Sequence, residues 1–142
     1  MSQKANWSDL LVNIVGHEPP PDSIDLRNSF IENCLADQDG RKLTQAHIHL
    51  AMQQGIYDWE QESLSNNARL NGLIRAPYHT GKSQQVAIGL SAYMTTRKHE
   101  LETLIVSADG GISAKRILSL RALFMSDMYK YWCKENNFNA VE

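Results

Sequence analysis

The fold prediction starts from eight residues near the middle of the chain, Ala76-Pro77-Tyr78-His79-Thr80-Gly81-Lys82-Ser83. A short apolar run that contains Leu73 and Ile74 precedes them, and residues 84–97 after them have the pattern of a helix. A strand, a tight loop that ends in Gly-Lys-Ser and a helix form the context of a phosphate-binding loop. We therefore expect this loop to bind the phosphates of a nucleotide.

The residue types of the loop suit this chemistry. Successive backbone N–H groups form a nest for an anion, and the following helix adds its positive N-terminal end. Gly81 lets the backbone approach the phosphates, Lys82 would reach the β- and γ-phosphate oxygens, and the Ser83 hydroxyl would bind Mg²⁺. The expected cofactors are thus ATP and Mg²⁺, with Ser83 as the metal ligand. The predicted cofactor-binding residues are Ala76, Pro77, Tyr78, His79, Thr80, Gly81, Lys82 and Ser83.

Ala76 stands where the usual Gly-x-x-x-x-Gly-Lys-Ser pattern has its first glycine. Alanine disfavours positive φ, and a bare Gly-Lys-Ser tripeptide also occurs by chance. The alternative is an ordinary strand-to-helix turn that uses Pro77 and Gly81 as turn residues.

Length and composition narrow the class of protein. The 142 residues suffice for one domain with a hydrophobic core. The net charge of -2 gives no overall basic field for nucleic acid, although a local basic surface stays possible. Cys34 and Cys133 lie far apart without metal-ligand spacing, which indicates free thiols in a reducing compartment. No apolar run approaches the roughly 20 residues of a membrane span, and no signal core follows the N-terminus, so we expect a cytoplasmic protein.

The first half of the chain has the pattern of helices. The predicted helices cover residues 6–16, residues 24–36 with Asp22 or Ser23 as the cap, and a third segment from Thr44 to Gln54 that Gly55 ends. A polar segment, residues 58–67, would then end in a loop. We expect residues 1–68 to form an N-terminal helical segment.

From Leu70 onward, predicted strands and helices alternate. Leu73 and Ile74 form a short buried strand, residues 82–97 a helix, and residues 103–108 the clearest strand of the chain. Gly110-Gly111 breaks that strand, and Ser113 can cap a long helix. The inner face of this helix would carry Ile117, Leu120, Phe124 and Met128.

This order predicts an α/β fold with a partial parallel sheet and right-handed crossovers. Residues 129–142 would be a helix that frays at its end.

Other candidate residues carry weaker signals, each with a structural alternative. Asp109 ends the second strand and could order Mg²⁺, or could be a turn residue. Gln45 could lie over an adenine, or be a solvated helix residue, and His79 could contact a phosphate or face solvent. Two basic pairs could touch a DNA backbone, or be a solvated surface, and an aromatic cluster is attributed to packing rather than to base stacking. These are Arg97-Lys98 and Lys115-Arg116, and Tyr129, Tyr131 and Trp132.

With Leu73-Ile74-Arg75 before it, the loop resembles the ATPase part of the large terminase subunit of tailed phages. Those loops often read Ala-Pro-Arg-x-x-Gly-Lys-Ser, so alanine at position 76 is typical of the family. The likeness covers roughly residues 42–130, including Leu104-Ile105-Val106-Ser107-Ala108-Asp109 and the helix with Leu120-Arg121-Ala122-Leu123. The resemblance implies a RecA-like P-loop NTPase fold, with residues 69–142 as the N-terminal half of a P-loop ATPase domain, and ATP-driven DNA packaging. It also implies double-stranded DNA, the small terminase subunit and the portal protein as partners, and a homo-oligomer.

Two departures from the family pattern bear on activity. Tyr78 and His79 occupy the part of the loop where many terminases carry an arginine, and Arg75 is the nearest one. No later strand ends in Asp-Glu, and the coupling motif and the nuclease carboxylates are absent from the sequence. The resemblance therefore implies a truncated terminase part that binds Mg-ATP and hydrolyses it poorly alone, with no catalytic residue assigned. The alternatives are a part of another DNA-dependent P-loop ATPase, such as a helicase, or a small non-enzymatic phage or prophage protein.

Overall fold

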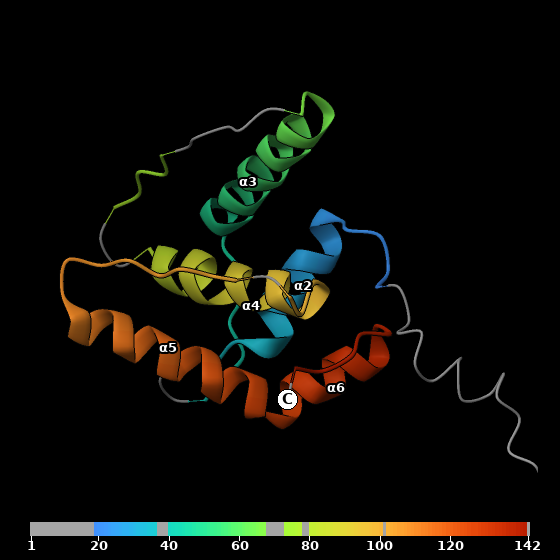
Figure 1. The fold of residues 1–142 in the computed structure, drawn as a ribbon, viewed down its shortest axis with the longest axis vertical. Helices are drawn as coiled ribbons and strands as arrows, with labels where there is room; N and C mark the ends of the chain where they lie inside the picture. The colour runs from blue at the N-terminus through green and yellow to red at the C-terminus, as the bar shows by residue number, and fades with distance from the viewer. Residues whose placement is uncertain (1–18, 37–39, 68–72, 78–79, 101, 142) are drawn as a thin grey trace, which may run out of the picture.

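The computed structural model describes residues 19–36, 40–67, 73–77, 80–100 and 102–141. Within these ranges the chain forms a bundle of helices, which Figure 1 shows with α3 and α5 on opposite sides of η1 and α4. The elements in chain order are α2 (Ile24–Cys34), α3 (His47–Ser65), the π-helix η1 (Ser83–Leu90), α4 (Ser91–Arg97), α5 (Gly110–Met125) and α6 (Asp127–Glu135).

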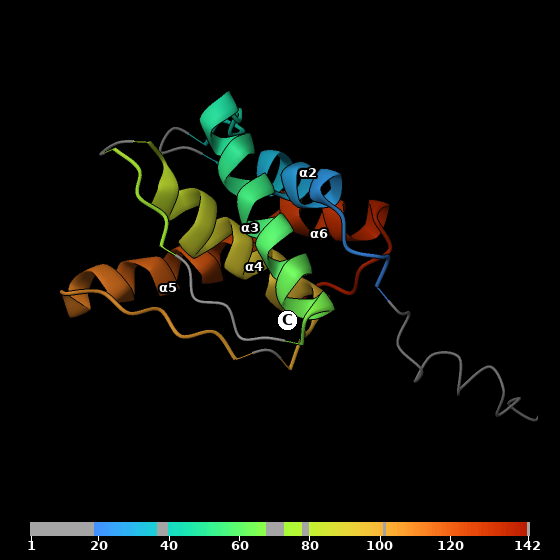
Figure 2. The same ribbon diagram turned by 90° about the horizontal axis from the view of Figure 1, so that it is seen from above.

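The described residues contain no β-strand and no sheet, so the predicted α/β P-loop NTPase fold is wrong. Residues 73–77 and 102–108 run along the outside of the bundle without helix or strand in Figures 1 and 2. Leu73, Leu104 and Val106 are 76, 87 and 77% exposed, where a buried strand was expected. The apolar, β-branched residues have the propensity for a strand, but a strand also needs a neighbour for its backbone hydrogen bonds, and these segments have none in the described part of the chain.

The hydrophobic core is centred on Phe30 of α2. The rings of Tyr93 (α4) and Trp132 (α6) meet Phe30 edge to face, with centroids 5.6 and 4.9 Å away. Tyr129 makes a third such contact at 6.2 Å. Aromatic pairs of this geometry each contribute about 0.5–1.5 kcal/mol beyond the burial of their area. The predicted packing role is confirmed for Tyr129 and Trp132, which are buried, whereas Tyr131 is exposed.

The same core takes residues from both predicted segments of the chain. Phe30 and Ile31 come from residues 1–68, and Ile88, Tyr93 and Trp132 come from residues 69–142. In the described residues the two segments therefore pack around one shared core.

Helix α2 agrees with its prediction, and α3 does not. The Ser23 hydroxyl accepts a hydrogen bond from the Leu26 N–H and caps α2, as one of the two expected caps. Helix α3 continues through Gly55, where the sequence predicted its end, and includes most of the polar segment 58–67. The reason is tertiary, because Ile56 is buried and the residues beyond it contact α2. The predicted helix 6–16 lies outside the described residues.

Helix α5 begins at Gly110, four residues earlier than predicted, because the Asp109 carboxylate, and not Ser113, caps it by accepting from the Gly111 N–H. Its predicted inner face is only partly right. Leu120 and Phe124 pack against the core, but Ile117 is 58% exposed and Met128 belongs to α6. Ile117 is exposed because the residues of α5 that pack against the core, Leu120, Leu123 and Phe124, lie in the last part of the helix, near α6.

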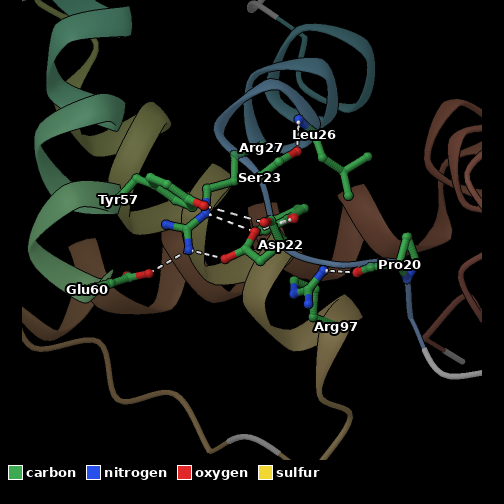
Figure 3. Close-up of polar contacts among 9 residues, drawn as sticks. Pro20, Asp22, Ser23, Leu26, Arg27, Tyr57, Glu60 and Arg97 are labelled. Carbon is green, nitrogen blue, oxygen red and sulfur yellow. Dashed lines mark hydrogen bonds and ion pairs between the residues drawn. The ribbon is translucent and has the colours of Figure 1, made fainter. Parts of the chain in front are cut away.

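Arg27 joins α2 to two other helices in a buried ion cluster (Figure 3). Its guanidinium pairs with Asp22, which precedes α2, and with Glu60 of α3 at 2.6 Å. It also lies over the ring of Tyr57, 4.9 Å from the centroid. The Tyr93 hydroxyl donates to Asp22 at 2.7 Å, which brings α4 into the cluster.

The ion cluster changes the titration of Asp22. Burial alone would raise the pKa of this carboxyl. Hydrogen bonds from Arg27 and Tyr93, and the charge of Arg27, lower the pKa below the ordinary 3.8. Asp22 therefore stays ionised in the folded protein and remains a partner for Arg27.

Candidate phosphate-binding site

The described part of the loop, residues 76–77 and 80–83, leads directly into η1. Gly81 has φ +68°, which a side chain would strain, so the Gly-Lys-Ser sequence has a backbone reason for its glycine. The Gly81 carbonyl accepts from the Gln85 N–H at 2.9 Å, which starts the helix. Tyr78 and His79, two of the predicted phosphate contacts, lie outside the described residues.

Lys82 extends back across the loop. Its Nζ donates to the carbonyl oxygens of Ala76 at 2.8 Å and Pro77 at 3.2 Å. The Thr80 hydroxyl also donates to the Pro77 carbonyl, at 2.8 Å. The ammonium group therefore lies beside the carbonyl oxygens at the start of the loop, near the N-terminal end of η1.

His49 of α3 fixes the loop from the other side. Its Nδ1 accepts from the Ala46 N–H at 3.0 Å, and its Nε2 lies 2.8 Å from the Thr80 carbonyl oxygen. A neutral ring that accepts at Nδ1 carries its proton on Nε2, so Nε2 donates to Thr80. The same nitrogen is 3.4 Å from the position of a Cβ on Gly81. The sequence prediction missed His49, although Ala46 has no side chain to cap α3 and a histidine three residues later can supply the acceptor.

Three buried glutamines, Gln45, Gln53 and Gln85, connect the start of η1 to α3 and the residues before it. Gln45, predicted to face an adenine or solvent, does neither, because it is 8% exposed and donates to the Gln85 side-chain oxygen at 2.9 Å. Gln53 donates to the Gln85 backbone carbonyl at 3.2 Å. These bonds tie α3, and Gln45 two residues before its start, to η1, so Gln45 has a structural role here.

The Ser83 hydroxyl is the predicted metal ligand, and it accepts a hydrogen bond from Arg116 of α5 at 3.3 Å. The sequence singled out Lys115-Arg116 for a DNA backbone and gave no reason to place either residue at the loop. Beside this contact lies a cavity of about 240 Å³ lined by Ile74, Lys82, Ser83, Val86 and Ala87. A larger groove of about 530 Å³ runs between α3 and residues 73–77, and includes Met52, Trp59, Ala76 and Pro77.

Asp109 was the other candidate for Mg²⁺, and its carboxylate instead caps α5, 2.8 Å from the Gly111 nitrogen. Asp109 thus has the structural role that the sequence left open as the alternative to binding Mg²⁺. Within the described ranges, no group of three or more His, Cys, Asp or Glu side chains is arranged to hold a metal ion. A magnesium ion at the loop would therefore take Ser83 from the protein and its other ligands from phosphates and water.

Arg97, the second candidate for DNA contact, has a structural role. Its guanidinium donates to the Pro20 carbonyl at 2.7 Å (Figure 3). It also lies over the Tyr93 ring, 5.8 Å from the centroid. Burial raises the pKa of both cysteine thiols, Cys34 and Cys133, which are free as predicted. Neither thiol is a reactive group.

The chain matches no family model, and no curated protein and no solved structure shows significant similarity to it. Among the helices of the described residues, none has the length and hydropathy to cross a bilayer. The described site consists of Gly81 at positive φ, Lys82 bonded to the carbonyls of Ala76 and Pro77, and the helix η1 that begins at Ser83.

Proposed function

We propose that this protein binds Mg-ATP through the loop Ala76–Ser83, as the ATP-binding part of a phage DNA-packaging motor of the terminase large-subunit type. The observation that carries the proposal is the position of Lys82, the N-cap residue of η1, whose ammonium group reaches back to the carbonyl oxygens of Ala76 and Pro77. An anion that entered here would exchange the contacts of Lys82 with two neutral carbonyls for contacts with charged phosphate oxygens, which add the attraction between opposite charges.

The surroundings of the loop support a preformed site. His49 holds the Thr80 carbonyl, and the glutamines anchor η1 to α3. Groups that such contacts hold in place before binding, here Thr80 and the start of η1, lose little conformational entropy when a ligand binds. The positive N-terminal end of the helix adds to the attraction for an anion.

The groove between α3 and residues 73–77 has room for the base. Ala76 and Pro77 belong both to the loop and to the groove, and Trp59 offers an aromatic surface within it. A triphosphate at the loop would leave its nucleoside beside this groove. Most ligand pockets combine such an apolar surface with a few polar anchors.

Efficient hydrolysis is outside the proposal. ATP hydrolysis needs a group that positions the attacking water and carboxylates that order Mg²⁺, and Asp109 is engaged in capping α5. The DNA-packaging role, with double-stranded DNA, the small terminase subunit, the portal protein and further copies of the chain as partners, rests on the resemblance of the loop sequence. The same resemblance places the protein in the cytoplasm of the host cell.

The proposal is tested by melting the full chain with and without Mg-ATP. At a concentration ten times its Kd, a ligand stabilises the folded state by about 1.4 kcal/mol. This corresponds to a rise in Tm of several degrees for a chain of this size. We expect this rise for the wild type and none for Lys82→Ala, whereas Lys134→Ala, which removes an exposed charge on α6, should behave as the wild type.

A second candidate function is that of a helical interaction protein without a nucleotide. The observation that favours it is the number of exposed apolar side chains on residues 73–74, 104–106 and α5. If Mg-ATP shifts the Tm of neither the wild type nor Lys82→Ala, the nucleotide site is refuted and this second function is favoured.

A further inference from the structure

Arg116 brings a second cationic side chain to the loop from a distant part of the sequence. Its Nη2 lies 3.3 Å from the Ser83 hydroxyl oxygen, and the two residues are 33 positions apart. Its side chain is half-buried between α5 and η1. Within the described part of the chain, no carboxylate forms an ion pair with this guanidinium.

The contact with the Ser83 hydroxyl uses one of the N–H donors of the Arg116 guanidinium. The guanidinium has five N–H donors in a planar fork that matches two oxygens of a phosphate. Hydrogen bonds from a cation to phosphate oxygens are stronger than one to a neutral hydroxyl. The present contact is thus one that a phosphate group in the loop would readily replace.

Magnesium gives a further reason for the exchange. Mg²⁺ would bind the Ser83 oxygen at about 2.0–2.1 Å, which is the oxygen that Arg116 now contacts. A Mg²⁺ ion on this oxygen would repel the guanidinium nitrogen that lies 3.3 Å from the same oxygen, although solvent at the exposed Ser83 weakens this repulsion. When Mg-nucleotide binds, Arg116 therefore turns away from Ser83, and the nearest negative charge is the phosphate chain itself.

We propose that Arg116 contacts the terminal phosphate of a bound nucleoside triphosphate, an inference that rests on the proposed ATP site. The guanidinium moves from Ser83 onto the terminal phosphate while Lys82 bridges the phosphates over the turn. Arg116 then distinguishes a triphosphate from a diphosphate, because the diphosphate lacks the group that it contacts.

The test is titration calorimetry of the full chain with ATP and with ADP, each in excess MgCl₂. Arg116→Ala should lose about tenfold or more of its affinity for ATP, the cost of one charged hydrogen bond. Its affinity for ADP should stay within about twofold of the wild type. Lys115→Ala, the adjacent residue with the same change of charge, should alter neither affinity, and Arg116→Lys should lie between the wild type and Arg116→Ala.

Each other outcome overturns a specific statement. Equal losses for ATP and ADP in Arg116→Ala would mean that Arg116 supports the loop rather than the terminal phosphate. If the wild type binds both nucleotides, Lys82→Ala binds neither and Arg116→Ala matches Lys115→Ala, the inference fails while the proposed function stands. If the wild type binds neither nucleotide, both fail. Circular dichroism melting of each variant confirms that it is folded before its affinities are compared.

Discussion

At the scale of single residues, two glycines meet different demands. Gly81 needs its positive φ at the turn before η1. Gly89 needs space, because a Cβ there would lie 2.9 Å from Cδ1 of Leu35 and 3.1 Å from Cγ1 of Ile31. Gly89 therefore sets how closely η1 can approach α2, and so how the loop is placed on the core.

Replacing Gly89 by alanine should destabilise the protein. Overpacking costs about 1–3 kcal/mol, and the better helix propensity of alanine returns about 1 kcal/mol. Urea unfolding should thus show a net loss of stability. The matched control is Gly55→Ala in α3, where a Cβ meets nothing within 4 Å. That change should be neutral or stabilising by up to about 1 kcal/mol. A gain of stability in Gly89→Ala would contradict the close approach of η1 and α2.

At the scale of secondary-structure elements, polar side chains set how α3 is attached. Glu60 joins it to α2 through Arg27, and the His49 ring and the glutamines join its beginning to the loop and η1. Breaking a buried ion pair on one side is costly, because the partner left behind stays charged and poorly solvated. One ion pair and several neutral hydrogen bonds thus hold α3 in its orientation, together with its buried Ile56.

The ion cluster predicts a pH dependence. Because the folded pKa of Asp22 is below its ordinary 3.8, its stabilising effect is fully present above that value and is lost as the pH falls through the folded pKa. Asp22→Asn should therefore lower the Tm at pH 7, and the difference from the wild type should shrink when both are melted near pH 3 and below. A difference that stays constant over this range would show that the ionised carboxylate contributes nothing. Asp25→Asn, an exposed residue of the first turn of α2, is the control for a change of charge.

At the scale of the whole molecule, the core occupies one side of the bundle and leaves apolar residues uncovered elsewhere. Phe30 and its ring neighbours lie where α2, α4 and α6 meet, whereas α5 and the segment 102–108 extend along the outside (Figure 2). Exposed apolar patches of this kind promote association. The described part of the molecule thus combines a well-packed core with exposed apolar residues that favour self-association.

The double change Leu104→Ser and Val106→Ser should reduce self-association with little effect on stability. Both side chains are largely exposed, and surface substitutions usually change stability by within about 0.5 kcal/mol. Sedimentation velocity at increasing protein concentration measures the association, and thermal melting measures the stability. Leu64→Ser changes a similarly exposed leucine near the end of α3. It should change association less, because Leu64 does not belong to the exposed apolar segment that contains Leu104 and Val106. A large drop in Tm for the double variant would mean that these residues face a core.

Several helices could be predicted because their signals are local. Ser23 before an apolar periodicity predicted α2, and the pattern after Lys82 predicted the helical region 83–97, though not its π-helical first half. Caps and periodicity act over a few residues, so the sequence carries them directly. The candidate phosphate loop was identified on the same basis, from residues adjacent in the chain.

The tertiary structure alone decided the features that depend on distant residues. The apolar run 103–108 has the composition of a strand, but a strand exists only with a partner for its backbone, and the described part of the chain provides none. Helix α3 passes Gly55 because burial and ion pairs outweigh the cost of one glycine. The neighbours of the loop, His49 and Arg116, are 31 and 33 residues from their contacts, and only packing brings them there. The sequence by itself thus determined the loop and the helices that begin at local caps, whereas the absence of a sheet and the charges around the loop follow from contacts that no local pattern encodes.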